Sequence, residues 1–229
     1  MRIRAAAVWV LALSTALAAH EAPARADAPS DAACVDAAVA ALQRRYEAVR
    51  DLRADIVQTS RSVALGSSAS EQLTSRGSVV LAKPGKMRWS YEEPEPSLVV
   101  SDGETLWIYD PVLREAQKLP ATQGYLSGAA VEFLLGVGEI RRAFDISALA
   151  CDDQRAALRL VPREPSSYER LEIAVDPKSG DLSRTTVFFV LGNVTEISFS
   201  NVELNRDPAP DVFRIELPSD VRVIELDAP

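Results

Sequence analysis

Histidine is almost absent from this sequence, and its scarcity limits the chemistry that the protein can perform. The one histidine is His20, which lies in an N-terminal segment that we expect to be removed from the mature chain. Without an imidazole, a Ser-His-Asp or Cys-His nucleophile system and the common zinc sites are excluded. The sequence also lacks a phosphate-binding glycine motif, a dinucleotide fingerprint and a cluster of metal ligands. We therefore predict a protein without enzymatic activity, without a metal and without a cofactor.

Long hydrophobic runs are absent apart from one at the N-terminus. Arg2 and Arg4 precede an apolar run over residues 5–19, and the small residues on either side of Arg25 fit cleavage before Asp27. The run is shorter than the ~20 apolar residues that a membrane helix needs. We interpret residues 1–26 as a cleaved secretory signal peptide and residues 27–229 as one mature domain. A retained N-terminal anchor is the alternative.

Basic residues are the minority in this chain. The sequence has 25 Lys and Arg against 33 Asp and Glu, which gives a formal net charge of -8. Removal of residues 1–26 takes away more basic than acidic side chains and leaves the mature chain more acidic. Proteins that bind nucleic acid neutralise its phosphates with clustered Lys and Arg. We therefore predict no nucleic-acid partner.

Only two cysteines, Cys34 and Cys151, are present. In an oxidising compartment, an even pair far apart in sequence favours a disulfide over a reactive site. Two unpaired buried thiols are the alternative, because bridging depends on a Cα separation that the sequence does not give. Cys34 does not fit a lipid-modified N-terminus, because Asp31 and two alanines stand where a lipobox has an aliphatic residue.

The period of the apolar residues changes once along the chain. From residue 35 to residue 52 they recur three or four apart, which predicts an amphipathic helix whose buried face carries Val35, Val39, Leu42, Tyr46, Val49 and Leu52. From residue 54 onward they alternate, and turn signals such as Lys83-Pro84-Gly85 and Ser101-Asp102-Gly103 separate short runs. This pattern predicts an antiparallel barrel or sandwich.

The expected strands share short length, alternation and bounding turn residues. We predict them at residues 55–63, 72–82, 86–92, 97–101, 105–109, 115–118, 144–149, 156–162, 168–175, 182–190, 194–204, 212–217 and 221–226. Residues 124–142 lack alternation, and their glycine breaks predict one or two short helices.

Large aromatic residues concentrate between residues 77 and 110. Met87, Trp89 and Tyr91 alternate in one strand, so they point to one face of the sheet. Trp107 and Tyr109 share a face of the strand at 105–109, opposite its aliphatic residues. A sheet with two apolar faces must cover one with a helix and fill the other with side chains or a ligand. An ordinary core is the alternative to a ligand.

This aromatic block resembles the periplasmic lipoprotein carrier family, LolA. That family's pattern runs through a basic-Pro turn, an aromatic strand, a Pro-containing loop and SDG-x-x-LW-x-Y-[DN]-P. The matching residues here are Lys83-Pro84, Met87, Trp89, Pro94, Ser101-Asp102-Gly103, Leu106-Trp107, Tyr109 and Asp110-Pro111. The resemblance covers most of the mature chain, including the N-terminal helix and a closing strand pair around Pro218.

The resemblance implies a mainly β fold, in which an incomplete, unclosed antiparallel β-barrel is covered by a lid of short helices over an apolar cavity. It implies a periplasmic, monomeric carrier that receives acylated lipoproteins from an inner-membrane lipoprotein-releasing ABC transporter and passes them to an outer-membrane lipoprotein acceptor. The family's latch arginine corresponds to Lys83, which keeps the charge but loses the planar five-donor fork. The expected cavity residues are Met87, Trp89, Trp107, Leu126, Phe133, Leu134 and Leu135.

Three other functions remain as alternatives. The same fold could serve as an envelope sensor of lipids or lipoproteins, or as the outer-membrane acceptor, which should carry an N-terminal lipid cysteine. An enzyme based on paired carboxylates would have to use Glu92, Glu93 and Glu95, which cluster around two prolines. A solvated, proline-stiffened hairpin is the simpler interpretation of that cluster.

Overall fold

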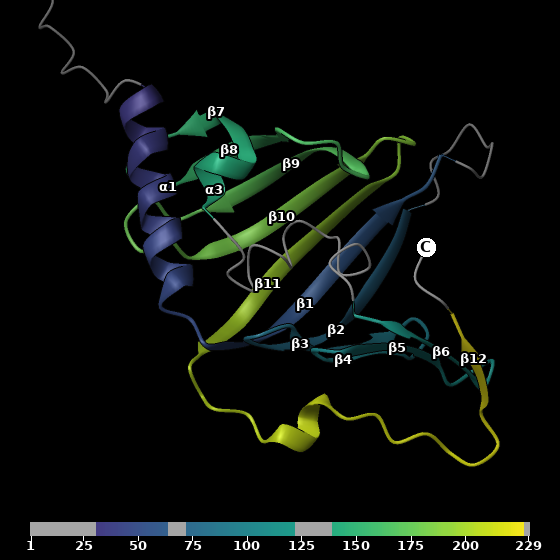
Figure 1. The fold of residues 1–229 in the computed structure, drawn as a ribbon. Helices are drawn as coiled ribbons and strands as arrows, with labels where there is room; N and C mark the ends of the chain where they lie inside the picture. Colours follow the sequence, from purple (N-terminus) through teal and green to yellow (C-terminus); the bar gives the residue numbers. More distant parts are fainter. Residues whose placement is uncertain (1–30, 64–71, 122–138, 227–229) are drawn as a thin grey trace, which may run out of the picture.

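One large sheet dominates the computed structural model, which describes residues 31–63, 72–121 and 139–226 (Figure 1). Its twelve strands lie in the order β12-β6-β5-β4-β3-β2-β1-β11-β10-β9-β8-β7. Their bounds are β1 Asp51–Arg61, β2 Gln72–Ala82, β3 Lys86–Glu93, β4 Ser97–Asp102, β5 Thr105–Asp110, β6 Glu115–Pro120, β7 Phe144–Cys151, β8 Ala156–Pro162, β9 Tyr168–Val175, β10 Leu182–Phe189, β11 Val194–Leu204 and β12 Arg222–Glu225.

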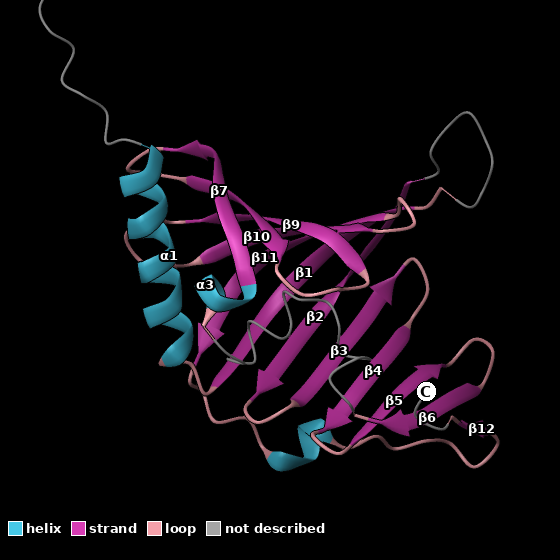
Figure 2. Cartoon of the chain, turned by 45° about the horizontal axis from the view of Figure 1, so that its top comes forward, coloured by secondary structure: helices cyan, strands magenta, loops and turns pink. Residues whose placement is uncertain are grey.

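The sheet is open, as expected, because β7 and β12 are its two edges and do not pair with each other. β1 lies at the centre of the sheet and pairs with both β2 and β11. The two arms, β2 to β6 and β11 to β7, curve toward the same side, as Figures 1 and 2 show. All pairs are antiparallel except one: β12 runs parallel to β6.

Short turns join most of the neighbouring strands, and each turn fixes the pairing of the two strands that it connects. In the turn between β4 and β5, the Asp102 carboxylate accepts hydrogen bonds from the backbone N–H groups of Glu104 and Thr105 at 2.9 and 2.8 Å. Those bonds lower the pKa of Asp102. Gly103 follows with a φ of +101°, which an L residue rarely adopts. The turn therefore closes in one register, which sets the partners of every residue in β5.

Helix α1 (Asp31–Glu47) has the predicted apolar face. Val35, Val39, Leu42 and Tyr46 are all buried, and the helix packs mainly on β7 and β8. The turn between β9 and β10 approaches its backbone closely, because a Cβ on Gly180 would lie 2.3 Å from the carbonyl oxygen of Ala41. The helix ends at residue 47 rather than near Leu52, which is a buried residue of β1.

The prediction of a strand at residues 212–217 is wrong. A short 3-10 helix, η1 (Pro210–Phe213), stands there instead, and the chain is irregular up to β12. Pro208 and Pro210 precede these residues and Pro218 follows them, and none of the three has an N–H group to donate, so a strand could not extend beyond 212–217 in either direction. Phe213, one of the apolar residues that suggested a strand, is buried in η1, which packs against β3 and β4.

Part of the expected lid lies outside the described residues. Helix α3 (Ile140–Ala143) falls at the end of the segment for which short helices are expected, and its Ile140 is buried in the core. The predicted cavity residues Leu126, Phe133, Leu134 and Leu135 are not among the described residues, and neither is the expected signal peptide at 1–26. Their roles stay predictions.

The core lies on one side of the sheet, which we call the inner face. It is the face that carries Leu52, Ala54 and Ile56 of β1 together with their partners in the neighbouring strands. The opposite side is the outer face. The inner-face residues Val79, Leu81, Met87, Trp89, Leu106, Leu119, Ile197, Val187, Leu171, Ile173, Leu158 and Leu160 form one buried cluster with the apolar face of α1.

Candidate functional site

The inner face is the candidate functional site because apolar residues dominate it from one arm of the sheet to the other. The inner-face residues are Leu52, Ala54, Ile56, Gln58 and Ser60 in β1, Leu73, Ser75, Gly77, Val79 and Leu81 in β2, and Thr195, Ile197 and Phe199 in β11. None of these described positions carries a charge. Charged side chains take the alternate positions of the same strands, so the alternation in sequence separates an apolar face from a polar one.

Two of the predicted cavity residues, Met87 and Trp89, lie on this face. Each is about 5% exposed and opposes an aliphatic residue of β2, Met87 facing Leu81 and Trp89 facing Val79. Both therefore belong to the buried cluster in this structure. They can line a cavity only where the residues that cover them move aside, so their role as lipid contacts stays a prediction.

Tyr91 completes the aromatic row, and its hydroxyl group is neutral. Its ring centroid lies 6.3 Å from that of Trp89, and its hydroxyl donates a hydrogen bond to Gln58 Oε1 at 2.8 Å. Burial raises the pKa of Tyr91 to about 12, although the side chains of Gln58 and Trp89 lower it in part. The phenol is therefore uncharged at neutral pH, and its polar atom is satisfied within the protein.

Several less buried apolar residues line the same face, although they were not among the predicted cavity residues. The register places Val99 and Ile108 beside Trp89, and Phe199 opposite Ile56. Ile108 is 37% exposed, whereas the other two are partly buried. Alternation alone could have placed each of them on a face. The sequence does not show which face, because that depends on the register between strands.

An open pocket of about 560 Å³ lies where β1 and β2 meet the hairpin of β10 and β11. Leu73 and Phe189 supply its apolar surface, and Leu73 is 57% exposed. Val63, Val190 and Leu191 are further exposed apolar residues at the ends of these strands. The inner face therefore reaches an apolar opening at this end of the sheet. The pocket is lined by Ser60, Arg61, Ser62, Gln72, Leu73, Phe189, Asn193 and Thr195.

The third predicted barrel residue, Trp107, does not share this surface, and the prediction that it lines the cavity with Met87 and Trp89 is wrong. Trp107 pairs with Val100 in β4, and Val100 pairs with Arg88. This row is the outer face, where the Lys118 ammonium lies 5.7 Å from the centroid of the Trp107 ring. In β5 it is Leu106 and Ile108 that face inward, because the tight turn at Gly103 sets the register.

Lys83, the predicted lid latch, bonds to helix α1. Its Nζ donates a hydrogen bond to the carbonyl oxygen of Tyr46 at 2.7 Å, and its backbone N–H donates one to the carbonyl oxygen of Arg50 at 2.8 Å. The last carbonyl groups of a helix have no partner within the helix, so a cation there is favourable. Partial burial lowers the pKa of Lys83, although the nearby Glu47 carboxylate opposes this shift. A bond to the lid would involve residues outside the described ranges.

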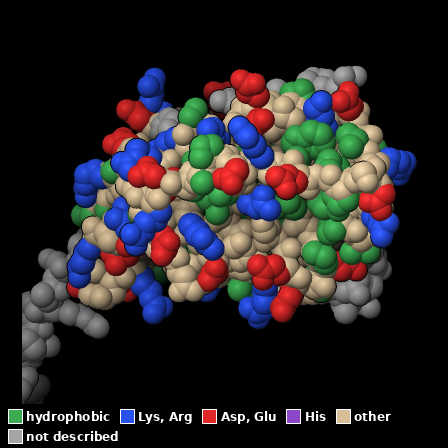
Figure 3. All heavy atoms as spheres, turned by 90° about the horizontal axis from the view of Figure 1, so that it is seen from below, with side chains coloured by type: hydrophobic (Ala, Val, Ile, Leu, Met, Phe, Trp, Pro, Cys, Tyr) green, Lys and Arg blue, Asp and Glu red, His purple; other side chains and the backbone are tan. Residues whose placement is uncertain are grey.

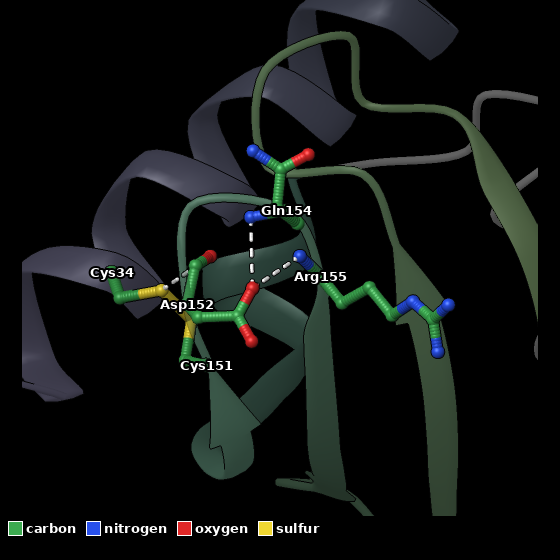
Figure 4. The surroundings of a disulfide bond; sticks show 5 residues. All are labelled: Cys34, Cys151, Asp152, Gln154 and Arg155. Atoms are coloured by element: carbon green, nitrogen blue, oxygen red, sulfur yellow. Dashed lines mark hydrogen bonds between the residues drawn. A yellow bond between two sulfur atoms is a disulfide. The ribbon is translucent and has the colours of Figure 1, made fainter.

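A disulfide fixes α1 against the edge of the sheet. Cys34 of α1 and Cys151 at the end of β7 are bonded, with their Cα atoms 6.0 Å apart (Figure 4). The next residue, Asp152, turns the chain into β8 by accepting hydrogen bonds from the backbone N–H groups of Gln154 and Arg155, both at 2.8 Å. Those two bonds lower the pKa of Asp152.

The three glutamates that a carboxylate-based enzyme would use lie on the surface. Glu92, Glu93 and Glu95 are exposed near the turn between β3 and β4, and Glu93 makes an ion pair with Arg76 at 3.6 Å. Among the described residues, no group of His, Cys, Asp and Glu could hold a metal ion. No described helix is long and apolar enough to cross a membrane.

The sequence matches the family model described as outer membrane lipoprotein carrier protein LolA over residues 47–216. An outer-membrane lipoprotein carrier protein of Nitrosospira multiformis is 31% identical over 189 residues, which are 81% of this chain and 87% of that protein. A protein of the same name from Cupriavidus necator is 29% identical over 200 residues, covering 86% of this chain and 90% of the other.

Solved structures are more distant in sequence. A LolA superfamily protein from Nitrosomonas europaea has a TM-score of 0.43 at 12% identity, covering 80% of this chain and 98% of the other. An uncharacterized conserved protein from Thermus thermophilus has a TM-score of 0.49 at 13% identity, covering 83% and 98%. The family model spans well over half of the sequence and contains β1, the aromatic strands and the inner face of the sheet. This chain therefore belongs to the LolA family of outer membrane lipoprotein carrier proteins.

Proposed function

We propose that this protein is a periplasmic carrier that holds the acyl chains of lipoproteins against its inner face and moves them from the inner to the outer membrane. The observation that carries this proposal is the largely apolar inner face of an open sheet, which has no charged side chain in the described parts of β1, β2 and β11, in a chain of the LolA family. The function requires reversible binding alone, so we assign no catalytic residue.

The energetics of an acyl chain in water explain why such a face is needed. Each CH₂ group gains ~0.8 kcal/mol on burial, so one long chain free in water costs on the order of 10 kcal/mol. A soluble carrier must supply apolar surface on a comparable scale. Aromatic residues and Met suit this task, because large rings offer apolar area and thioethers adapt to irregular shapes.

Absence of charge is as important as apolarity on this face. A buried charge without a partner is costly, and a buried hydroxyl needs a hydrogen bond. Tyr91 meets the second condition through Gln58, and its raised pKa keeps it neutral. Charged residues of β1 such as Arg53 and Asp55 take the outer-face positions. An acyl chain on the inner face would therefore displace water without leaving a charge unsolvated.

The exchange partners of a carrier follow from its route. The donor would be an inner-membrane lipoprotein-releasing ABC transporter, and the receiver an outer-membrane lipoprotein acceptor. A monomer is sufficient, because one copy provides the complete inner face. The signal peptide expected at residues 1–26 would deliver the chain to the periplasm. The names of the relatives favour carriage over the alternative of an envelope sensor.

The proposal is tested by release of a triacylated lipoprotein from inner-membrane vesicles that contain the transporter. With ATP and the purified mature protein, the lipoprotein should appear in the soluble fraction in a complex of one copy each. Addition of outer-membrane vesicles should then deplete the complex. Lipoprotein that stays in the inner-membrane vesicles, although the transporter hydrolyses ATP, would contradict the proposal.

The same assay tests Lys83. Lys83→Leu removes the hydrogen bond to the Tyr46 carbonyl but keeps the apolar stem, so the fold should remain and transfer should fall. Lys86→Leu at the start of β3, just after this turn, is the matched control, because it also removes one charge. Equal transfer by the Lys83→Leu and Lys86→Leu proteins would show that Lys83 is not a latch. Circular dichroism of both variants checks the fold.

A further inference from the structure

A second pocket, of about 450 Å³, lies on the outer face, away from the proposed acyl-chain site. Its floor is made by β1, β2, β3 and β11, and the segment that leads from β11 into η1 forms one wall. In Figure 1 this segment passes below the sheet. The pocket is lined by Asp51, Leu52, Arg53, Ser78, Val80, Arg88, Ser90, Glu203, Arg206, Pro208, Ala209 and Val212.

The wall of this outer-face pocket is held firmly. Asp51 is only 5% exposed, and its carboxylate accepts hydrogen bonds from the backbone N–H groups of Arg206 at 2.7 Å and Asp207 at 3.2 Å. On the other side, Arg88 Nη1 donates to the carbonyl oxygen of Val212 at 3.3 Å. The pocket is therefore a built feature of the fold, since both ends of its wall are tied to the sheet.

Three arginines line the pocket, and none of them makes an ion pair with a described carboxylate. Arg53, Arg88 and Arg206 are absent from every ion pair found among the described residues, although acidic residues outnumber basic ones in the sequence. Most arginines on the other strands pair with a carboxylate. Unpaired guanidinium groups around one hollow indicate a place for an anion from outside the chain.

The acidic groups near the pocket are largely occupied. Both oxygens of Asp51 accept backbone hydrogen bonds, and the Asp207 carboxylate pairs with Arg50 at 3.3 Å. Glu203 is the remaining acid in the lining, and it lies opposite Arg53 in the neighbouring strand. Seen from below in Figure 3, Lys and Arg side chains on the surface are interspersed with Asp and Glu side chains. The pocket therefore has three guanidinium groups without an ion pair, of which Arg88 already donates to backbone carbonyl oxygens, against one uncommitted carboxylate.

We propose that the outer-face pocket binds a phosphate monoester. Guanidinium groups bind phosphate oxygens through paired N–H donors, and the hydroxyls of Ser78 and Ser90 add further donors. Val80, Pro208 and Ala209 provide an apolar wall for the organic part of the ligand. Such a group could belong to a small soluble molecule or to the headgroup of a lipid such as phosphatidic acid.

The test is titration calorimetry of the mature protein with glycerol 3-phosphate at low ionic strength. Arg53→Gln/Arg206→Gln should weaken binding tenfold or more, because charge-assisted hydrogen bonds to the phosphate are lost. A tenfold loss of affinity corresponds to about 1.4 kcal/mol of binding free energy. Arg155→Gln/Arg184→Gln removes the same total charge from β10 and the turn before β8, and should bind like the parent. No heat of binding up to millimolar ligand, or equal weakening in both double variants, would overturn the proposal.

Vesicles identify the source of the phosphate. If the ligand is a lipid headgroup, the parent protein should sediment with phosphatidic acid vesicles but not with phosphatidylcholine vesicles, and Arg53→Gln/Arg206→Gln should stay in solution. If the ligand is a small molecule, calorimetry should detect binding of glycerol 3-phosphate to the parent protein. In that case the parent protein should not sediment with phosphatidic acid vesicles. Either result supports phosphate binding in the outer-face pocket, and each identifies a different source of the phosphate. Acyl-chain binding at the inner face should be unchanged in the Arg53→Gln/Arg206→Gln protein.

Discussion

Ile108→Asp is expected to weaken the binding of an acyl chain about tenfold or more. Ile108 faces inward beside Val99 and Trp89, and it is 37% exposed, so an aspartate there can be accommodated without unfolding the protein. A carboxylate placed against hydrocarbon must lose its water or take up a proton, and either costs free energy that the bound state does not recover. Each 1.4 kcal/mol of this cost lowers affinity tenfold.

Val161→Asp is the matched control for this change. Val161 is 40% exposed, lies in β8 of the sheet's other arm and follows the inner-facing Leu160, so it points to the outer face. Displacement of a fluorescent fatty acid measures both variants at equal protein concentration. Equal affinities in the two variants would mean that acyl chains do not lie on the inner face near β5. Similar thermal midpoints would show that both variants are folded.

Removal of the disulfide is expected to lower the thermal midpoint by about 5–15 °C. Cys34 and Cys151 close a loop with a sequence separation of 117 residues, and such bridges typically contribute ~2–4 kcal/mol by restricting the unfolded chain. In a protein of this size, each kcal/mol corresponds to ~2–4 °C. The bond also holds α1 on β7, which has no strand on its other side.

The measurement is thermal unfolding of the mature protein with and without reductant. Cys34→Ser/Cys151→Ser should unfold at the temperature of the reduced parent, and reductant should not change its midpoint. A parent midpoint that does not respond to full reduction, verified by thiol titration, would show that the bridge does not contribute to stability.

Strong turn signals made several strands predictable to the residue. β2, β8, β9 and β11 have the predicted bounds, because residues such as Pro84 and the 176–180 turn stop the alternating pattern sharply. β1 begins four residues earlier than predicted. Leu52 fits both the helical spacing of the residues before it and the alternation of the residues after it. The sequence therefore did not show where the helix ends and β1 begins.

Features that depend on pairing between strands were less predictable. Alternation shows that Trp107 and Leu106 point to opposite faces, but the partners in β4 decide which of them faces inward. The parallel pairing of β12 with β6 involves residues about a hundred positions apart, and no local pattern reports it. The three unpaired arginines of the outer-face pocket come from β1, β3 and the segment after β11, so only the fold brings them together.

The location of the bound acyl chain tests the central claim most directly. A lipopeptide with a nitroxide label at the methyl end of its acyl chain can be added to the methyl-labelled protein and followed by NMR. The label should broaden the methyl signals of inner-face residues such as Ile108 and Ile197 and leave that of the outer-face Val161 sharp. Broadening confined to outer-face methyl groups would contradict the account.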